Sequence, residues 1–269
     1  MASKAARRGL KAEERLISAI NSKEELGKKL INSIEGFLGV ELVSCSSEKQ
    51  PPRIKSDIVV SCNRRSILIS VKEFEPKADY NHVERNYVEY YAKKWSIPRE
   101  VYLGLKQFAG EVDKNGNPIL IDAIEKEAEQ LNTFPGKLSK RRRIFINELP
   151  KETQNAIRQF FKFNKEKIIK DILIGEEDIQ FFIIIKQEDF RASYYVVPTR
   201  EVLDVFSTGD VEITQRGSLQ VGNVIMQRKS GNHHTSSGWT DRSASQLQFK
   251  IKPSQCIKNR NPVMSEDLG

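Results

Sequence analysis

The sequence KSDIVVSCNRRSILISVK at residues 55–72 decides how the chain folds. Two apolar runs, at 57–62 and 66–72, are rich in the β-branched residues that favour strands. Only the short polar stretch 63–65 separates them, which is too little chain for anything but a tight turn. The stretch therefore predicts a β-hairpin inside a mixed α/β chain.

Alternation along the hairpin places polar side chains together. Asp57 begins the first strand, and Ser70 and Lys72 share one face of the second strand, because successive side chains point to opposite faces. The other face is apolar and is expected to pack on the core. We therefore expect the face with Asp57, Ser70 and Lys72 to line a cleft at one end of the hairpin.

These residue types suit the hydrolysis of a phosphodiester. Such a reaction uses a divalent metal held by carboxylate and carbonyl oxygens, which stabilises the charge that builds on the phosphate. Asp57 and the main-chain carbonyl of Val71 are the candidate metal ligands, and Lys72 would act on the attacking water or neutralise the phosphate. The alternative is that the acid at a strand start and the lysine at a strand end merely face solvent, and the spacing alone is a weak pattern.

A helix is expected before the hairpin, at residues 11–20, where Leu16, Ile17 and Ile20 form one apolar stripe. Glu13 lies on the same inward face, so it is a candidate second catalytic acid. The alternative for Glu13 is a structural ion pair with a nearby cation.

The rest of the chain follows a mixed pattern. A second helix is predicted from a capping box of Ser22 and Glu25 to Gly39, and mainly helical structure from 81 to 174. The remaining elements are strands at 40–47, 180–187, 193–198, 210–214, 223–228 and 245–252 and a helix at 199–206. This order predicts one α/β domain (1–269) with a catalytic core (1–110), a helical basic part (111–175), a β-rich part (176–256) and a tail (257–269).

The composition bounds the setting of the protein. Lysine and arginine number 44 against 36 acidic residues, a surplus that favours polyanions such as DNA but also fits an ordinary basic protein. No stretch approaches the roughly 20 apolar residues of a membrane helix, so no membrane partner is expected. No phosphate-binding G-x-x-x-x-G-K-[ST] loop is present, so ATP is not expected.

The three cysteines form no C-x-x-C pair and are odd in number. The pattern argues against a disulfide framework and a zinc site, and predicts that Cys45 and Cys62 are small core residues. A reducing, cytoplasmic setting fits this usage.

Residues suited to reading DNA bases gather near the end of the chain. Arginine and lysine suit guanine, and glutamine suits adenine or mixed contacts. The candidates are Gln227, Arg228, Lys229, Ser230, Arg242, Gln246, Gln248 and Lys250. The basic run at 137–143, with Arg141, Arg142 and Arg143, is expected to meet phosphates. The alternative for the C-terminal group is a solvated hairpin loop.

Several stretches resemble known nucleases. KSDIVV followed by ILISVK resembles the PD-(D/E)XK nuclease motif. DILIGEED, STGDVEITQRGSL, GNVIMQRKSG, SQLQFKIKP and SKRRRIFINELPKETQN resemble segments of small restriction enzymes that cut four-base sites. The likeness is closer to the GCGC cutters and looser to the CCGG cutters.

This resemblance implies a type II restriction endonuclease of a restriction-modification system, with a central mixed sheet flanked by helices. Its implied cofactor is Mg²⁺, for which Mn²⁺ would substitute, and its partner is double-stranded DNA, cut by a monomer or weak homodimer. It implies catalytic positions at Asp57, Ser70, Lys72 and the helix acid Glu13. It also implies an aromatic wedge between base pairs, for which we name Tyr80, with His82 close to the bases.

One departure from the motif matters. The middle position is usually acidic, or an amide in this group, but Ser70 is neutral and short. Because of Ser70, a non-catalytic DNA-binding protein on the same fold stays an alternative. A second alternative is a repair or junction-resolving nuclease that selects DNA by its structure and not by its sequence.

Overall fold

The computed structural model divides the chain into two compact units. It describes residues 4–51, 54–63, 65–113, 115, 117, 129–132, 144–228, 234–235, 238–239 and 246–267. The first unit comprises Met1–Asn81, Lys170–Phe206 and Ile251–Gly269, and the second comprises His82–Ile169 and Ser207–Lys250. Among the described residues, no helix is long and apolar enough to span a membrane.

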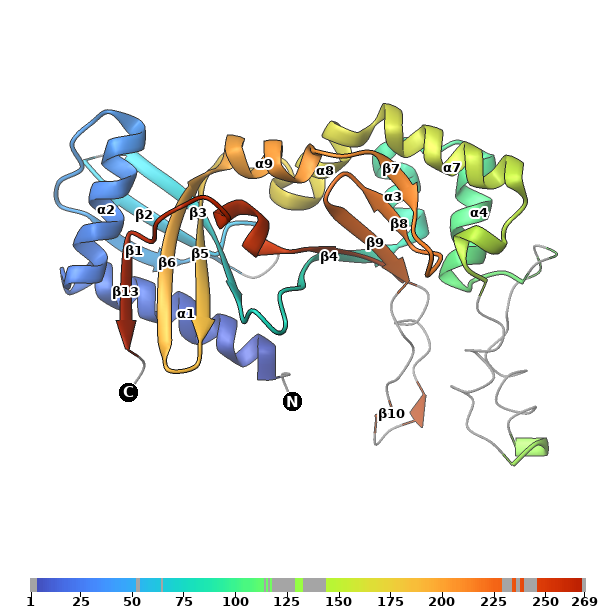
Figure 1. Cartoon of the computed structure of the whole chain (residues 1–269), viewed down its shortest axis with the longest axis horizontal. Helices are drawn as coiled ribbons and strands as arrows, with labels where there is room; N and C mark the ends of the chain where they lie inside the picture. The colour runs from blue at the N-terminus through green and yellow to red at the C-terminus, as the bar shows by residue number, and fades with distance from the viewer. Residues whose placement is uncertain are drawn as a thin grey trace. The chain divides into compact units, whose positions relative to one another are not determined.

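The first unit is built on a six-stranded mixed sheet (Figure 1). In sheet order its strands are β1 (Ser46–Lys49), β2 (Ile58–Cys62), β3 (Arg65–Phe74), β5 (Ile179–Glu188), β6 (Arg191–Pro198) and β13 (Met264–Asp267). β3 and β5 run parallel, and the other neighbours are antiparallel. The helices of this unit are α1 (Lys4–Asn21), α2 (Glu25–Leu38) and α9 (Thr199–Ser207), with a short 3₁₀ helix at Pro253–Ile257. α8 (Lys165–Ile174) leads into β5.

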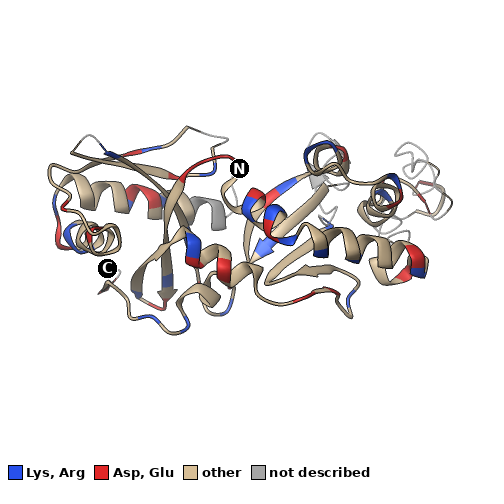
Figure 2. Ribbon diagram, turned by 90° about the horizontal axis from the view of Figure 1, so that it is seen from above, with Lys and Arg blue, Asp and Glu red and all other residues tan. Residues whose placement is uncertain are grey.

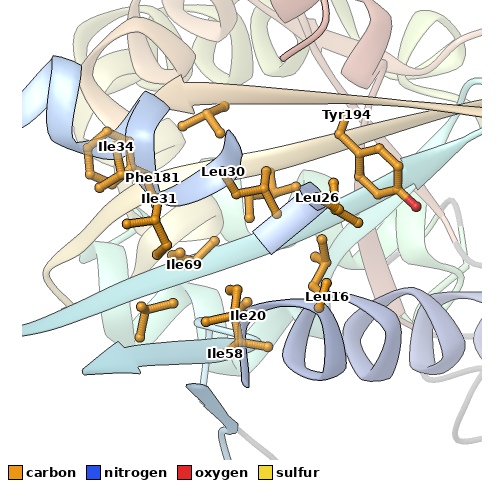
Figure 3. Packing of buried hydrophobic residues seen from close by; sticks show 14 of the residues in the cluster. Leu16, Ile20, Leu26, Leu30, Ile31, Ile34, Ile58, Ile69, Phe181 and Tyr194 are labelled. Carbon is orange, nitrogen blue, oxygen red and sulfur yellow. The ribbon is translucent and has the colours of Figure 1, made fainter. Parts of the chain in front are cut away.

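The core of the first unit lies between α1, α2 and one face of this sheet (Figure 3). Leu16 and Ile20 of α1 are buried with Ile58 and Ile69 of the predicted hairpin. Burial of such side chains contributes roughly 1.5–3 kcal/mol each. The predicted hairpin and its inward apolar face are confirmed, since β2 and β3 pair antiparallel with Ile58 opposite Ile69.

The start of α2 differs from the prediction. Its N-cap is Glu24, and no side chain caps the helix, so the expected capping box of Ser22 and Glu25 is wrong. Ser22 lies two positions before this N-cap, and Lys23 between them has a positive φ of 56°, so the helix does not begin at Ser22. The predicted end is confirmed, because Gly39 takes the left-handed conformation (φ 65°) that glycine adopts readily.

The second unit holds a five-stranded sheet. In sheet order its strands are β4 (Asn81–Tyr87), β12 (Gln246–Ile251), β9 (Val224–Arg228), β8 (Leu219–Val221) and β7 (Val211–Ile213). Its helices are α3 (Val88–Trp95), α4 (Arg99–Ala109) and α7 (Lys151–Phe163), with a 3₁₀ helix at Ile146–Glu148 and a two-stranded ribbon of β10 (His234–Thr235) and β11 (Gly238–Trp239). The helices pack on the sheet through aromatic rings, with Tyr91 stacked on Trp95 at 4.6 Å and edge-on to Phe249 at 5.3 Å.

Two strands in this chain correct the sequence predictions. Residues 81–87 were expected to be helical but form β4, because pairing with β12, more than 150 residues later, outweighs the local pattern. The first predicted strand, 40–47, begins later, as β1 at Ser46–Lys49.

The segment after Cys256, expected to be a polar tail, also forms a strand. β13 pairs with β6, and Glu266 accepts hydrogen bonds from Arg15 at 2.8 Å and from the hydroxyl of Tyr194. These bonds satisfy a half-buried carboxylate and hold the strand against α1.

The cysteine prediction is wrong in one respect. Cys45 and Cys62 form a disulfide, with their Cα atoms 4.2 Å apart. Cys45 directly precedes β1, and the pairing of Ser46 with Ser61 brings it opposite Cys62. Counting cysteines could not reveal this pair, because it depends on the strand register. Both residues do lie in or against the core, as expected, and Cys256 is free and buried.

Candidate active site

Asp57, Ser70 and Lys72 lie together at one end of the hairpin. Asp57 immediately precedes β2, and the register places it opposite Ser70 of β3. The main-chain N–H of Asp57 donates to the carbonyl of Ile69 at 2.9 Å, which extends the strand pairing to the predicted catalytic residues. The strand pairing itself therefore assembles the predicted cluster.

One carboxylate oxygen of Asp57 accepts three hydrogen bonds. Oδ2 receives the hydroxyl of Ser70 at 2.9 Å, the main-chain N–H of Val71 at 2.6 Å and Nζ of Lys72 at 3.2 Å. Within the described part of the chain, no hydrogen bond to Oδ1 is present. The carboxylate is thus held through one oxygen, and the other is available to a ligand.

The ammonium of Lys72 lies among three oxygens. Besides Asp57, its Nζ donates to Oγ of Ser70 at 2.7 Å and to the main-chain carbonyl of Val71 at 3.0 Å. Ser70 is fully buried, whereas the side chains of Lys72 and Asp57 are 16% and 26% exposed. The oxygens therefore converge on one positive charge at the boundary between core and solvent.

This donor set fits a hard divalent cation. The carboxylate of Asp57 and the carbonyl of Val71 are oxygen ligands of the kind that Mg²⁺ prefers, and Mg²⁺ usually keeps several waters besides one or two carboxylates. No group of three or more His, Cys, Asp or Glu side chains in the described ranges is arranged to hold a metal. A site here would therefore rest on Asp57 as its one carboxylate, with neutral oxygens beside it.

Glu13 does not join this cluster. Its carboxylate pairs with Nζ of Lys49 on β1 at 2.6 Å and takes part in none of the hydrogen bonds around Asp57. This is the ion pair that the sequence left open as the alternative. The helix pattern correctly placed Glu13 on a packed face but could not show which strand that face meets.

A polar pocket of about 570 Å³ lies in the second unit. It brings together four residues predicted to read bases, namely Gln227, Arg228, Gln248 and Lys250. The remaining lining residues are Phe145, Asn147, Glu148, Gln215, Arg216 and Ser218. Sequence reasoning missed Asn147, Gln215 and Arg216, although the polar TQRGS turn at 214–218 was a signal that could have indicated them.

The strand register explains why Gln227, Gln248 and Lys250 meet. Gln248 of β12 pairs with Gln227 of β9, so their amides lie side by side on one face of the sheet. Lys250 is two residues further along the same face, and burial lowers the pKa of its ammonium. The pocket thus combines amide donors and acceptors with cationic groups.

Arg228 is held in place by a close approach of main chain. It is buried, and a Cβ atom added to Gly110 would lie 2.5 Å from its Nη1. Gly110 ends α4 in the left-handed conformation (φ 80°), which glycine adopts without strain. A glycine at this position therefore leaves room for the guanidinium.

Other predicted DNA contacts are placed as follows. Tyr80 is 50% exposed, with Nζ of Lys252 at 4.7 Å from its ring centroid, and His82 is an exposed residue of β4. Gln246 lies on β12 but not in the pocket. Arg141, Arg142, Arg143, Lys229, Ser230 and Arg242 lie outside the described residues. Lysines and arginines that are described occur in both units, interspersed with acids (Figure 2).

Comparison with known proteins gives a family match and a structural match. The family model described as "R.HinP1I restriction endonuclease" matches residues 54–257. The crystal structure of restriction endonuclease MspI in complex with its cognate DNA superposes with a TM-score of 0.53 at 13% sequence identity, over 91% of this chain and 89% of that chain. No match was found among curated proteins. At this identity the structural match establishes the fold, which confirms the predicted mixed α/β, restriction-endonuclease-like architecture.

Proposed function

The chain belongs to the R.HinP1I restriction endonuclease family, and we propose that this type II site-specific deoxyribonuclease hydrolyses duplex DNA at Asp57 and Lys72 with a divalent metal. The observation that carries the active-site proposal is the convergence of Asp57 Oδ2, Ser70 Oγ and Val71 O on the ammonium of Lys72. The carboxylate and carbonyl oxygens suit a metal ion, and the ammonium of Lys72 suits a negatively charged scissile phosphate.

Each residue of the cluster has a distinct part in this proposal. Asp57 and the carbonyl of Val71 would hold the metal, with Mg²⁺ as the physiological ion and Mn²⁺ as a substitute. When bound, the metal supplies Lewis-acid stabilisation of the charge that develops on the phosphate. The ammonium of Lys72 would act on the attacking water or neutralise the negative charge of the phosphate oxygens. Ser70 orients both side chains, because its hydroxyl donates to Asp57 and accepts from Lys72.

Ser70 also explains why the chemistry would depend strongly on Asp57. An acidic residue at this position would add a second negative charge beside the metal, and serine supplies only a neutral oxygen. We therefore expect weaker metal binding than a site with two carboxylates would give.

The pocket of the second unit is proposed to read the DNA sequence. Arg228 and Lys250 can donate to the O6 and N7 acceptors of guanine, and the amides of Gln227 and Gln248 can both donate and accept. These groups support a short, GC-containing target, and we propose a four-base GCGC-like site. Tyr80 is proposed as a wedge between base pairs, supported by its half-exposed ring.

Cleavage of unmethylated plasmid DNA tests the proposal. Purified protein is incubated with the plasmid in Mg²⁺ or in EDTA, and the products are separated on a gel. Discrete fragments in Mg²⁺ alone are expected. A smear would indicate a nuclease that selects structure, and binding of duplex DNA without cleavage in Mg²⁺ or Mn²⁺ would contradict the proposal.

A further inference from the structure

A carboxylate in the loop before β5 holds the main chain that leads into Asp57. Oε1 of Glu177 accepts from the main-chain N–H of Lys55, and Oε2 accepts from the N–H and the hydroxyl of Ser56 at 2.8 and 2.7 Å. Ser56 is buried, so its N–H and hydroxyl rely on a protein acceptor. Glu177 thus fixes the two residues that immediately precede the catalytic aspartate.

A second side chain from the same segment holds β3. In the parallel pairing of β3 with β5, Leu68 is opposite Ile179 and Ile69 is opposite Phe181, so the register shifts at Gln180. Oε1 of Gln180 accepts from the main-chain N–H of Leu68 at 2.6 Å, two residues before Ser70 in the chain. Such irregularities are enriched next to active sites, where they re-aim side chains.

The segment is itself ordered by local bonds. Nε2 of Gln180 donates to Asp178 at 3.0 Å, which turns its Oε1 toward β3. Nζ of Lys55 donates to the carbonyl of Ile172 at 2.8 Å, which adds a second tie between the residues before β2 and the end of α8. Neither Glu177 nor Gln180 touches Asp57 or Lys72 in the hydrogen bonds described above.

We propose that Glu177 and Gln180 are positioning residues. They hold the main chain before Asp57 and before Ser70, and so keep these two side chains at hydrogen-bonding distance in the active site. The inference rests on the proposed function of the Asp57–Lys72 cluster. The bonds between Asp57 and its partners span only 2.6–3.2 Å, so a shift of the residues before β2 would disturb all of them together. Loss of such outer partners of a metal site typically lowers metal affinity or activity by about 10–100-fold.

The test compares Glu177→Gln with Glu176→Gln. The glutamine at 177 keeps the shape of the side chain but places an NH₂ donor against the main-chain N–H of Lys55 or of Ser56, where the structure needs an acceptor. Glu176 is the adjacent exposed carboxylate, so its variant controls for the loss of one negative charge. Gln180→Ala is the second variant and applies the same test if Glu177→Gln does not fold.

Four readouts separate positioning from simple stability. Circular dichroism melting defines a temperature at which each variant is folded. Hydrogen–deuterium exchange of metal-free protein measures the protection of the amides at 55–57 and 68. Cleavage of plasmid DNA at that temperature gives kcat and the Mg²⁺ concentration for half-maximal rate, and a shift assay without metal gives DNA affinity.

We expect Glu177→Gln to lose protection at 55–56, and to lower kcat or raise the Mg²⁺ requirement about 10–100-fold, with unchanged DNA affinity and a normal Glu176→Gln control. Wild-type cleavage by the folded variant would overturn the inference. Slower cleavage without faster exchange would also overturn it, because the effect would not act through the residues before Asp57. Absence of cleavage by the wild-type protein would instead refute the proposed function.

Discussion

Replacement of Lys72 by methionine distinguishes the contribution of Lys72 to catalysis from its contribution to stability. Nζ of Lys72 donates three hydrogen bonds, to Asp57 at 3.2 Å, to Ser70 at 2.7 Å and to the carbonyl of Val71 at 3.0 Å. In Lys72→Met the apolar stem is retained, and Asp57 Oδ2 keeps its bonds from Ser70 and the Val71 N–H. The cost to stability should therefore be about 1–2 kcal/mol, which corresponds to a charge-assisted hydrogen bond in a partly exposed site.

The effect on catalysis should be much larger. Loss of a positioned proton carrier or charge-stabilising group lowers kcat by about 10²–10⁴-fold. DNA affinity without metal should stay within about threefold of the wild type, since base reading is assigned to the second unit. The melting point should fall by roughly 2–8 °C. Added Mg²⁺ should raise it again, because the proposed metal ligands, the carboxylate of Asp57 and the carbonyl of Val71, remain.

The assay is single-turnover cleavage of a plasmid below the melting point of the variant. Lys77→Met, which alters an exposed lysine five positions downstream, is the matched control and should cleave normally. The catalytic role of Lys72 requires a loss of cleavage rate of at least about 10²-fold in this variant. If Lys72→Met cleaved DNA within about tenfold of the wild-type rate, that role would be refuted.

Three further predictions concern other groups. Ser70→Asp would place a second carboxylate against Asp57, so it should lower the melting point without metal and reduce the Mg²⁺ concentration for half-maximal cleavage. Melting curves and a metal titration measure the two effects, and an unchanged Mg²⁺ requirement would contradict the weaker metal binding assigned to Ser70. Gln248→Ala should weaken the base preference at one position of the target site more than it lowers overall DNA affinity, as measured by sequencing of the cut ends. An equal loss of affinity for all DNA sequences would count against base reading by Gln248. Glu111 directly follows Gly110 at the end of α4, and its carboxylate pairs with Lys106 at 3.1 Å. Burial outweighs this pair and raises the pKa of Glu111 to about 7, above its unfolded value near 4.5. The stability that its neutral form contributes is therefore fully present below about pH 4.5 and lost as pH rises through 7. Denaturant unfolding at pH 5 and 8 should therefore show a smaller difference for Glu111→Gln than for the wild type, and an equal difference would exclude Glu111 as the source.

The part of the site that follows from local pattern was predictable. Alternation placed Asp57, Ser70 and Lys72 on one face of the predicted hairpin, and in the observed register Asp57 lies opposite Ser70. The sequence also placed Gln227 and Gln248 on two strands joined by a polar loop, whereas the strand register of the structure shows that they pair. These predictions needed only the period of a strand and the length of a turn.

Contacts between distant segments were not predictable in this way. Glu177 meets Lys55 across more than 120 residues, and its place depends on the parallel alignment of β5 with β3. β4 formed where a helix was expected, because its hydrogen bonds go to β12. Glu13 was read correctly as inward-facing, but its partner Lys49 belongs to a strand that the sequence placed several residues too early.

The ends of DNA cut by the wild-type and Asp57→Asn proteins test the central claim most directly. A random-sequence library would be digested in Mg²⁺, and the new termini of both samples would be sequenced. The proposed function predicts that one short, GC-containing motif flanks the wild-type termini and that Asp57→Asn produces no new termini. Termini without a shared motif, or continued cutting by Asp57→Asn, would contradict it.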